Sequence, residues 1–182
     1  REPRIGGRRG GPQAQVGQEG LFMITKHSSG QFFMAPDFGY FVAKSQPDFE
    51  QEVKTARRIN AILGNTGAAL KSKDADERLI AASLLIAQYR TARFFPATQE
   101  PIDAEESKLI FNAIVNANWK QTKFGDPDPW MLFTQLGMTE MDGWRFPQKV
   151  RGRDDLRDAV LQWVRAHGDT YRIKRFVPKA DR

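Results

Sequence analysis

The segment from Ala68 to Tyr89 constrains the fold more than any other part of the chain, because it predicts a helix that is apolar on nearly every side. Asp74 stands where an N-cap belongs, and Glu77 three residues later completes a capping box, which places the helix start near Ala75. The apolar and aromatic residues beyond that start are Leu79, Ile80, Ala81, Ala82, Leu84, Leu85, Ile86, Ala87 and Tyr89. A stripe this wide must be covered by other helices, so we expect a central core helix.

Length and composition indicate one domain with tails. The chain has 182 residues, 40% of them hydrophobic, with 13 Phe and 4 Trp, which suffices for one sizeable core. It has no cysteine, which excludes disulfides, zinc-thiolate sites and thiol nucleophiles and is compatible with both a cytosolic and an exported protein. No run approaches the about 18 to 20 apolar residues that span a bilayer, so we expect no transmembrane segment in this chain.

The formal net charge of +6 is concentrated at the two ends of the chain. Residues 1–19 carry four arginines and two glutamates, and residues 149–182 carry ten Lys or Arg and five Asp. The residues between them are nearly balanced. A protein that grips nucleic acid across its folded face would more often carry the excess in its core domain.

Composition shifts along the chain predict its organisation. We expect a disordered Gly/Arg-rich tail over 1–19, one globular domain over 20–177 and a short tail over 178–182. Within the domain, 20–45 is β-rich and broken by turn residues, 46–168 is helical, and 170–177 has the composition of a strand that could complete the N-terminal sheet. The strands in 20–45 are hydrophobic on both faces, so something must cover them.

Capping signals predict about five helices. Ser45 with Asp48, and Pro47 in the first turn, predict a helix that ends at Gly64. Asp103 predicts a start after the turn-forming segment 94–101, and Asp128 predicts a short helix before Gly137. A last helix closes near Gly168. The fold class is therefore α+β, predominantly helical, with about five helices packed with a small antiparallel β-hairpin or meander.

The entry to the central helix resembles the second helix of HEAT-like repeats. The residues that carry the resemblance are Leu70, Ser72, Asp74, Arg78, Ala81, Ala82 and Leu85. In those repeats an aspartate caps the helix, an arginine follows four residues later, and an alanine pair allows close helix packing. Glu77 departs from the valine that is usual before the arginine, and the helix over 104–118 repeats the cap without the arginine and alanine pair. The resemblance implies a protein-binding scaffold rather than a catalyst.

Motifs that could carry chemistry have ordinary structural alternatives. Asp37-Phe38-Gly39 matches the magnesium-binding tripeptide of protein kinases, but the other kinase motifs are missing and a turn explains it. His27 and His167 lack a nucleophile elbow, and His167 falls where a helix C-terminus favours a cation. Two acidic pairs could hold a hard cation, Asp126 with Asp128 and Glu105 with Glu106. Both pairs stand where helix caps are expected, which explains them without a metal. We therefore predict no catalytic residues, no metal site and no cofactor.

Two groups of residues are candidates for binding. The candidate partner-binding aromatics are Trp119, Trp130, Phe133, Trp144 and Phe146, and the alternative is that they plug the base of the helical layer. The candidate contacts to phosphates or an acidic partner are Arg4, Arg8, Arg9, Arg172, Lys174 and Arg175. The favoured alternative is a flexible linker for the first three and edge-strand protection for the last three.

The sequence favours a non-catalytic protein-protein interaction or scaffold domain, such as a subunit or the soluble part of a larger protein. The alternative is a nucleic-acid-associated protein that uses its basic N- and C-terminal segments, and an enzyme of an unrecognised type comes third. A binding module predicts an exposed aromatic patch around Trp130 and Trp144. A nucleic-acid protein predicts that both basic ends converge on one face, and an enzyme predicts a deep pocket with perturbed pKa values.

Overall fold

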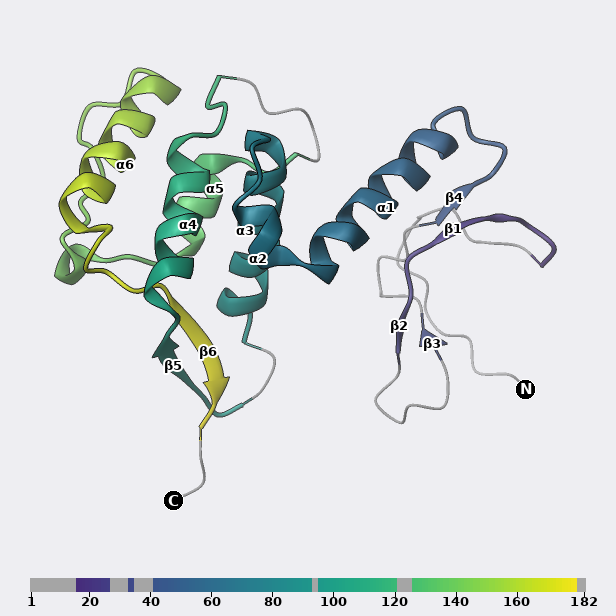
Figure 1. The fold of residues 1–182 in the computed structure, drawn as a ribbon, viewed down its shortest axis with the longest axis horizontal. Helices are drawn as coiled ribbons and strands as arrows, with labels where there is room; N and C mark the ends of the chain where they lie inside the picture. Colours follow the sequence, from purple (N-terminus) through teal and green to yellow (C-terminus); the bar gives the residue numbers. More distant parts are fainter. Residues whose placement is uncertain (1–15, 27–32, 35–40, 93–94, 121–125, 180–182) are drawn as a thin grey trace, which may run out of the picture. The chain divides into compact units, whose positions relative to one another are not determined.

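The computed structural model describes residues 16–26, 33–34, 41–92, 95–120 and 126–179, and these form a predominantly helical α+β fold. The chain divides into two compact units, one over residues 1–60 and the other over residues 61–182. The sequence predicted one globular domain over 20–177, and the behaviour of the two units as a single cooperative domain stays a prediction. Most of the tail predicted over 1–19 lies outside the described residues (Figure 1).

The first unit contains one interrupted β-hairpin. Strand β1 (Gly20–Phe22) pairs antiparallel with β4 (Phe41–Ala43), and inside this pair β2 (Thr25–Lys26) pairs antiparallel with β3 (Phe33–Met34). Gly20 is required at its position, because a Cβ there would come within 2.4 Å of both the Phe41 ring and the Val42 carbonyl. This arrangement corresponds to the hairpin alternative for the β-rich segment, and Asp37-Phe38-Gly39 lies outside the described residues.

Helix α1 (Phe49–Gly64) begins later than its predicted capping box indicates. The Asp48 carbonyl accepts from the Glu52 amide, so Asp48 stands at the cap position and Ser45 does not. Residues 45–48 form turns instead, and Pro47 lies before the helix rather than in its first turn. The end at Gly64 agrees with the prediction, and the helix crosses the boundary between the two units.

The second unit is built around α3 (Ala75–Arg90), which is the predicted core helix. Asp74 caps it by accepting from the amides of Asp76 and Glu77. The helix packs against α2 (Thr66–Leu70), α4 (Ala104–Val115) and α5 (Pro129–Gln135), and α6 (Arg153–His167) packs on α4 and α5 (Figure 1). The short helix α2, capped by the Asn65 side chain, was not among the helices that capping signals predicted.

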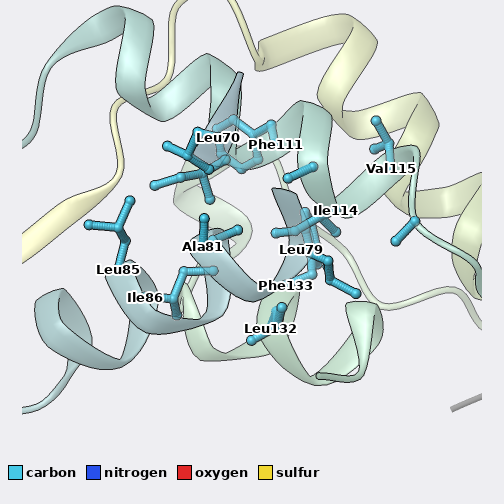
Figure 2. Packing of buried hydrophobic residues seen from close by; sticks show 14 of the residues in the cluster. Leu70, Leu79, Ala81, Leu85, Ile86, Phe111, Ile114, Val115, Leu132 and Phe133 are labelled. Atoms are coloured by element: carbon cyan, nitrogen blue, oxygen red, sulfur yellow. The ribbon is translucent and has the colours of Figure 1, made fainter. Parts of the chain in front are cut away.

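Facing side chains from α2, α3, α4 and α5 form the core of the second unit (Figure 2). Ala81, Ala82 and Ile86 of α3 and Ile110 and Ile114 of α4 have no exposed surface. Because the alanine side chains are small, neighbouring helices approach closely at these positions. Larger side chains fill the rest of the space between the helices at high packing density. The labelled members of this core are Leu70, Leu79, Ala81, Leu85, Ile86, Phe111, Ile114, Val115, Leu132 and Phe133.

The C-terminal strand does not join the N-terminal hairpin, so that expectation is wrong. Strand β6 (Lys174–Pro178) pairs antiparallel with β5 (Ala97–Pro101), inside the segment that the sequence predicted only as turn-forming (Figure 1). The pair is fixed at one end by Ile173, which is buried and accepts from the Ile102 amide at 2.8 Å. None of the described helices is long and apolar enough to cross a membrane.

Candidate interaction surface

The first turn of α5 is held in place by one aspartate with two functions. The Asp128 carboxylate accepts from the amides of Trp130 and Met131 at 2.9 and 3.2 Å, as the sequence predicted for an N-cap. Its other oxygen lies 2.6 Å from Nη2 of Arg153, at the start of α6. Asp128 therefore fixes both the position of Trp130 and the end of the loop that leads into α6.

Part of the aromatic group lies in the core, as the plug alternative predicts. Phe133 is 1% exposed and Trp119 is 2% exposed, with the Trp119 indole N–H donated to the Ile114 carbonyl at 3.0 Å. Phe133 lies edge-on to Trp144 and Trp163, with ring centroids 4.7 and 5.8 Å apart. Trp119 and Phe133 are therefore not accessible to a partner, and Phe133 packs against Trp130 and Trp144 from the core.

The other three aromatic candidates form a contiguous surface, which we call the aromatic shelf: Trp130, Trp144 and Phe146. The Trp130 ring centroid lies 6.3 Å from that of Trp144 and 5.7 Å from that of Phe146. The two tryptophans are half-buried, whereas Phe146 is 61% exposed. Met131, which follows Trp130 in α5, is 54% exposed. Phe146 and Met131 supply the exposed part of the surface around the half-buried Trp130 and Trp144.

A short turn before the shelf fixes the position of Trp144. In the 3₁₀ helix η1 (Glu140–Asp142), the Asp142 carboxylate accepts from the Thr139 amide and hydroxyl at 3.0 and 2.9 Å. The Asp142 carbonyl accepts from the Trp163 indole at 3.1 Å. Burial favours the neutral carboxyl, but the bonds from Thr139 and the charge of Lys174 prevail and hold the pKa of Asp142 below its usual value.

Gly143 allows the chain to turn from this helix toward the shelf. Its φ is +76°, and a Cβ there would come within 2.9 Å of Nε2 of His167. The loop then encloses a shallow hollow of ≈ 330 Å³ against α6, lined by Trp144, Trp163 and His167 among others. His167 occupies the predicted helix C-terminus, and its ring lies 5.2 Å from that of Trp163. Gly143 and the C-terminal end of α6 therefore both line the hollow beside Trp144.

The loop that carries the shelf is also basic, which the sequence analysis missed. Residues 143–153 contain four cations and neither Asp nor Glu. Arg153 is paired with Asp128, whereas Arg145, Lys149 and Arg151 are exposed and make no ion pair with any residue that the structure describes. The sequence analysis summed charges over long terminal regions, and these sums hid the excess of cations in this loop. A count of charges over 143–153 alone would have revealed it.

The predicted C-terminal cations have partners within the chain. Arg172 donates to the carbonyls of Asp169 and Tyr171, and Lys174 Nζ lies 3.7 Å from the Asp142 carboxylate. Arg175 lies 3.9 Å from Glu100 across the β5–β6 pair. These contacts correspond to the structural alternative for this strand, which begins at Lys174 rather than at residue 170. Arg4, Arg8 and Arg9 lie outside the described residues.

A half-buried polar pair links α3 to α4 away from the shelf. The Tyr89 hydroxyl lies 3.1 Å from both oxygens of Glu106. Burial and the charge of Glu106 raise the pKa of Tyr89 to about 12, so this phenol stays protonated and donates at neutral pH. Within the described ranges, no group of three His, Cys, Asp or Glu side chains gathers as metal ligands would.

The comparisons with known proteins give no relative from which to transfer a function. No family model, no curated protein and no solved structure matches this chain.

Proposed function

We propose that this protein is a non-catalytic interaction or scaffold domain that binds a protein partner through the aromatic shelf. The supporting observation is the contiguity of Trp130, Trp144 and Phe146 on one rigid support. Aromatic side chains offer large contact areas with little rotamer entropy to lose, and they dominate the binding energy of many interfaces. The resemblance of residues 70–85 to HEAT-like repeats favours the same class of function.

Rigidity of the shelf supports this proposal. Three contacts fix its frame: the Asp128 cap, the Asp128–Arg153 ion pair and the hydrogen bond from Trp163 to Asp142. A surface that is already ordered loses little conformational entropy when a partner binds. The frame therefore suits recognition of a protein partner by exposed rings.

The second candidate is a nucleic-acid-associated protein, and the unpaired Arg145, Lys149 and Arg151 favour it. Cations next to exposed aromatic rings also occur in proteins that bind single strands, where bases stack on the rings. This candidate predicts salt-dependent binding of a single-stranded oligonucleotide that is lost when the three cations are replaced.

A photo-crosslinking amino acid at position 146 tests the protein-binding proposal. Benzoyl-phenylalanine replaces Phe146 in one variant and the 95% exposed Phe95 in the matched control, each expressed in the cells that make the protein. We expect a discrete protein adduct from position 146 that position 95 does not give. The same adducts from both positions, or none from position 146, would contradict the proposal.

A further inference from the structure

The unpaired cations lie beside the aromatic shelf because the loop is anchored to α5 at both ends. Phe146 packs on Trp130, and Arg153 is paired with Asp128, the cap of the same helix. Lys149 is three residues from the first anchor and Arg151 is two residues from the second. An extended chain spans at most about 3.6 Å per residue, so both Cα atoms lie within about 11 Å of an anchor.

Two further observations restrict where these cations lie. Arg145 stands between two shelf residues and lines the hollow with Trp144. The Arg151 amide donates to the Asp155 carboxylate at 2.6 Å, which fixes the backbone of the loop just before α6. The shelf therefore has a basic rim of Arg145, Lys149 and Arg151, whose side chains make no ion pair in the described part of the chain.

A basic rim around apolar rings fits an acidic protein segment better than a nucleic acid. Trp130 and Phe146 meet edge to face, with 73° between their ring planes, and Trp130 is tilted by 49° from Trp144, so the shelf rings do not form parallel platforms for bases. Met131 at the start of α5 and Val150 in the loop over 143–153 are exposed and suit an aliphatic or aromatic side chain.

Nearby carboxylates separate these two partners further. Asp154, Asp155 and Asp158 follow the loop directly in α6. They would repel the continuous negative charge of a phosphate backbone. A peptide can place a few carboxylates at the rim and none near α6, so the mixed charge pattern selects for a partner with spaced charges.

We propose that the segment that docks on the shelf is an acidic protein segment, in which a bulky apolar side chain lies between carboxylates. The apolar side chain packs on Trp130 and Phe146, and the carboxylates pair with Arg145, Lys149 and Arg151. This inference rests on the proposed function of the shelf as a protein-binding surface. It adds the chemistry of the partner.

Selection from a displayed library of random peptides of about twelve residues tests this proposal on the full chain. Four proteins are compared: the wild type, Phe146→Ser, a rim variant and a matched control. The rim variant carries Arg145→Gln, Lys149→Gln and Arg151→Gln. The control carries Lys71→Gln, Lys73→Gln and Lys179→Gln, which remove the same charge from exposed positions outside the shelf. Thermal melting verifies that all four remain folded.

We expect the wild type and the control to enrich peptides with Asp or Glu on both sides of Trp, Phe or Leu. The rim variant should lose the acidic enrichment, and a selected peptide should bind it about tenfold more weakly in a titration, because three charge pairs at the rim are lost. Salt should weaken binding to the wild type more than binding to the rim variant.

Other results would distinguish failure of the acidic-partner proposal from failure of the shelf as a protein-binding surface. Enrichment of apolar peptides without an acidic excess, or equal acidic enrichment by the rim variant, would overturn the acidic partner and leave the shelf as a protein-binding surface. Enrichment that Phe146→Ser does not change, or no enrichment, would overturn both proposals. Tighter binding of single-stranded oligothymidine than of any selected peptide, lost in the rim variant, would replace the acidic segment with a nucleic acid.

Discussion

The two units of this protein use similar apolar sequences in different ways. In the second unit, side chains from α2 to α6 bury one another, and several have no exposed surface. Among the first-unit residues whose burial the structure describes, 16–24 and 41–60, only Phe41 and Val42 are buried, while Phe22, Met23 and Ile24 are 40–55% exposed. The comparison teaches that an apolar run contributes to stability only when another layer covers it, and a narrow hairpin supplies no such layer.

The largest expected effect comes from emptying the core of the second unit. Phe111 is 1% exposed and lies edge-on to Trp163 and Tyr171, so Phe111→Ala leaves a cavity among large rings. We expect a loss of about 3–5 kcal/mol in the free energy of unfolding, measured by urea denaturation.

The matched substitution in the first unit is Phe22→Ala. Phe22 stacks on Phe41 at 4.6 Å but is 45% exposed, so we expect a loss below about 1 kcal/mol in the main transition. Equal losses from the two substitutions would show that the hairpin and the helical unit contribute alike to stability, and the comparison would fail.

The next effect concerns polar links. Asp128 caps α5 and pairs with Arg153, and its side chain is only 18% exposed, so Asp128→Ala removes a cap and leaves a guanidinium without its partner. We expect a loss of about 1–2 kcal/mol in unfolding free energy. The first-unit counterpart, Lys44 with Glu19, is open to solvent, and Lys44→Ala should cause no measurable change. A larger loss from Lys44→Ala than from Asp128→Ala would reverse the expected order.

How far the sequence predicts this molecule differs between helices and strands. Local signals sufficed for α3 and α5, because Asp74 and Asp128 cap them as their spacing indicates. The start of α1 was misplaced because Ser45 and Asp48 fit a box that the chain uses as a turn. Strand β5 was missed because Thr98, Gln99 and Glu100 have no apolar alternation, and only its pairing with residues 175–177 makes it a strand.

The candidate surface was predictable in part for the same reason. Composition revealed the aromatic group, but packing decided that Trp119 and Phe133 are buried and Phe146 is exposed, and no spacing rule separates these residues. The basic rim was present in the sequence as a local charge run. Its nearness to the shelf depends on the Asp128–Arg153 pair, which joins residues that no local motif connects.

A smaller effect is expected from the link between α3 and α4, at high pH. The pKa of Tyr89 is about 12 in the folded protein and near 10 when unfolded, so the unfolded state releases this proton first as the pH rises. The stability contributed by Tyr89 is therefore complete below about pH 10 and is lost as the pH rises through about 12.

The comparison of the wild type with Tyr89→Phe isolates this contribution. The difference in unfolding free energy between the two proteins should shrink between about pH 9 and about pH 11, because only the wild type has the phenol at this position. Urea denaturation of both proteins at both pH values gives the four unfolding free energies that this comparison requires. A difference that stays constant or grows with pH would show that burial and Glu106 do not raise the pKa of this phenol.

A deletion gives the most direct test of the comparison between units, and only a small effect is expected from it. Deletion of residues 1–48 removes the hairpin and keeps α1 whole, including Ile62, whose side chain is buried in the core of the second unit. Every other member of that core lies between residues 69 and 173. The truncated chain should therefore unfold with the free energy of the full chain within about 0.5 kcal/mol. A chain that begins at Ala61 serves as the control, because it loses the helical turns that precede Ile62 and should be less stable. A large loss from the first deletion would show that the hairpin stabilises the helical unit, which would support the single cooperative domain that the sequence predicted.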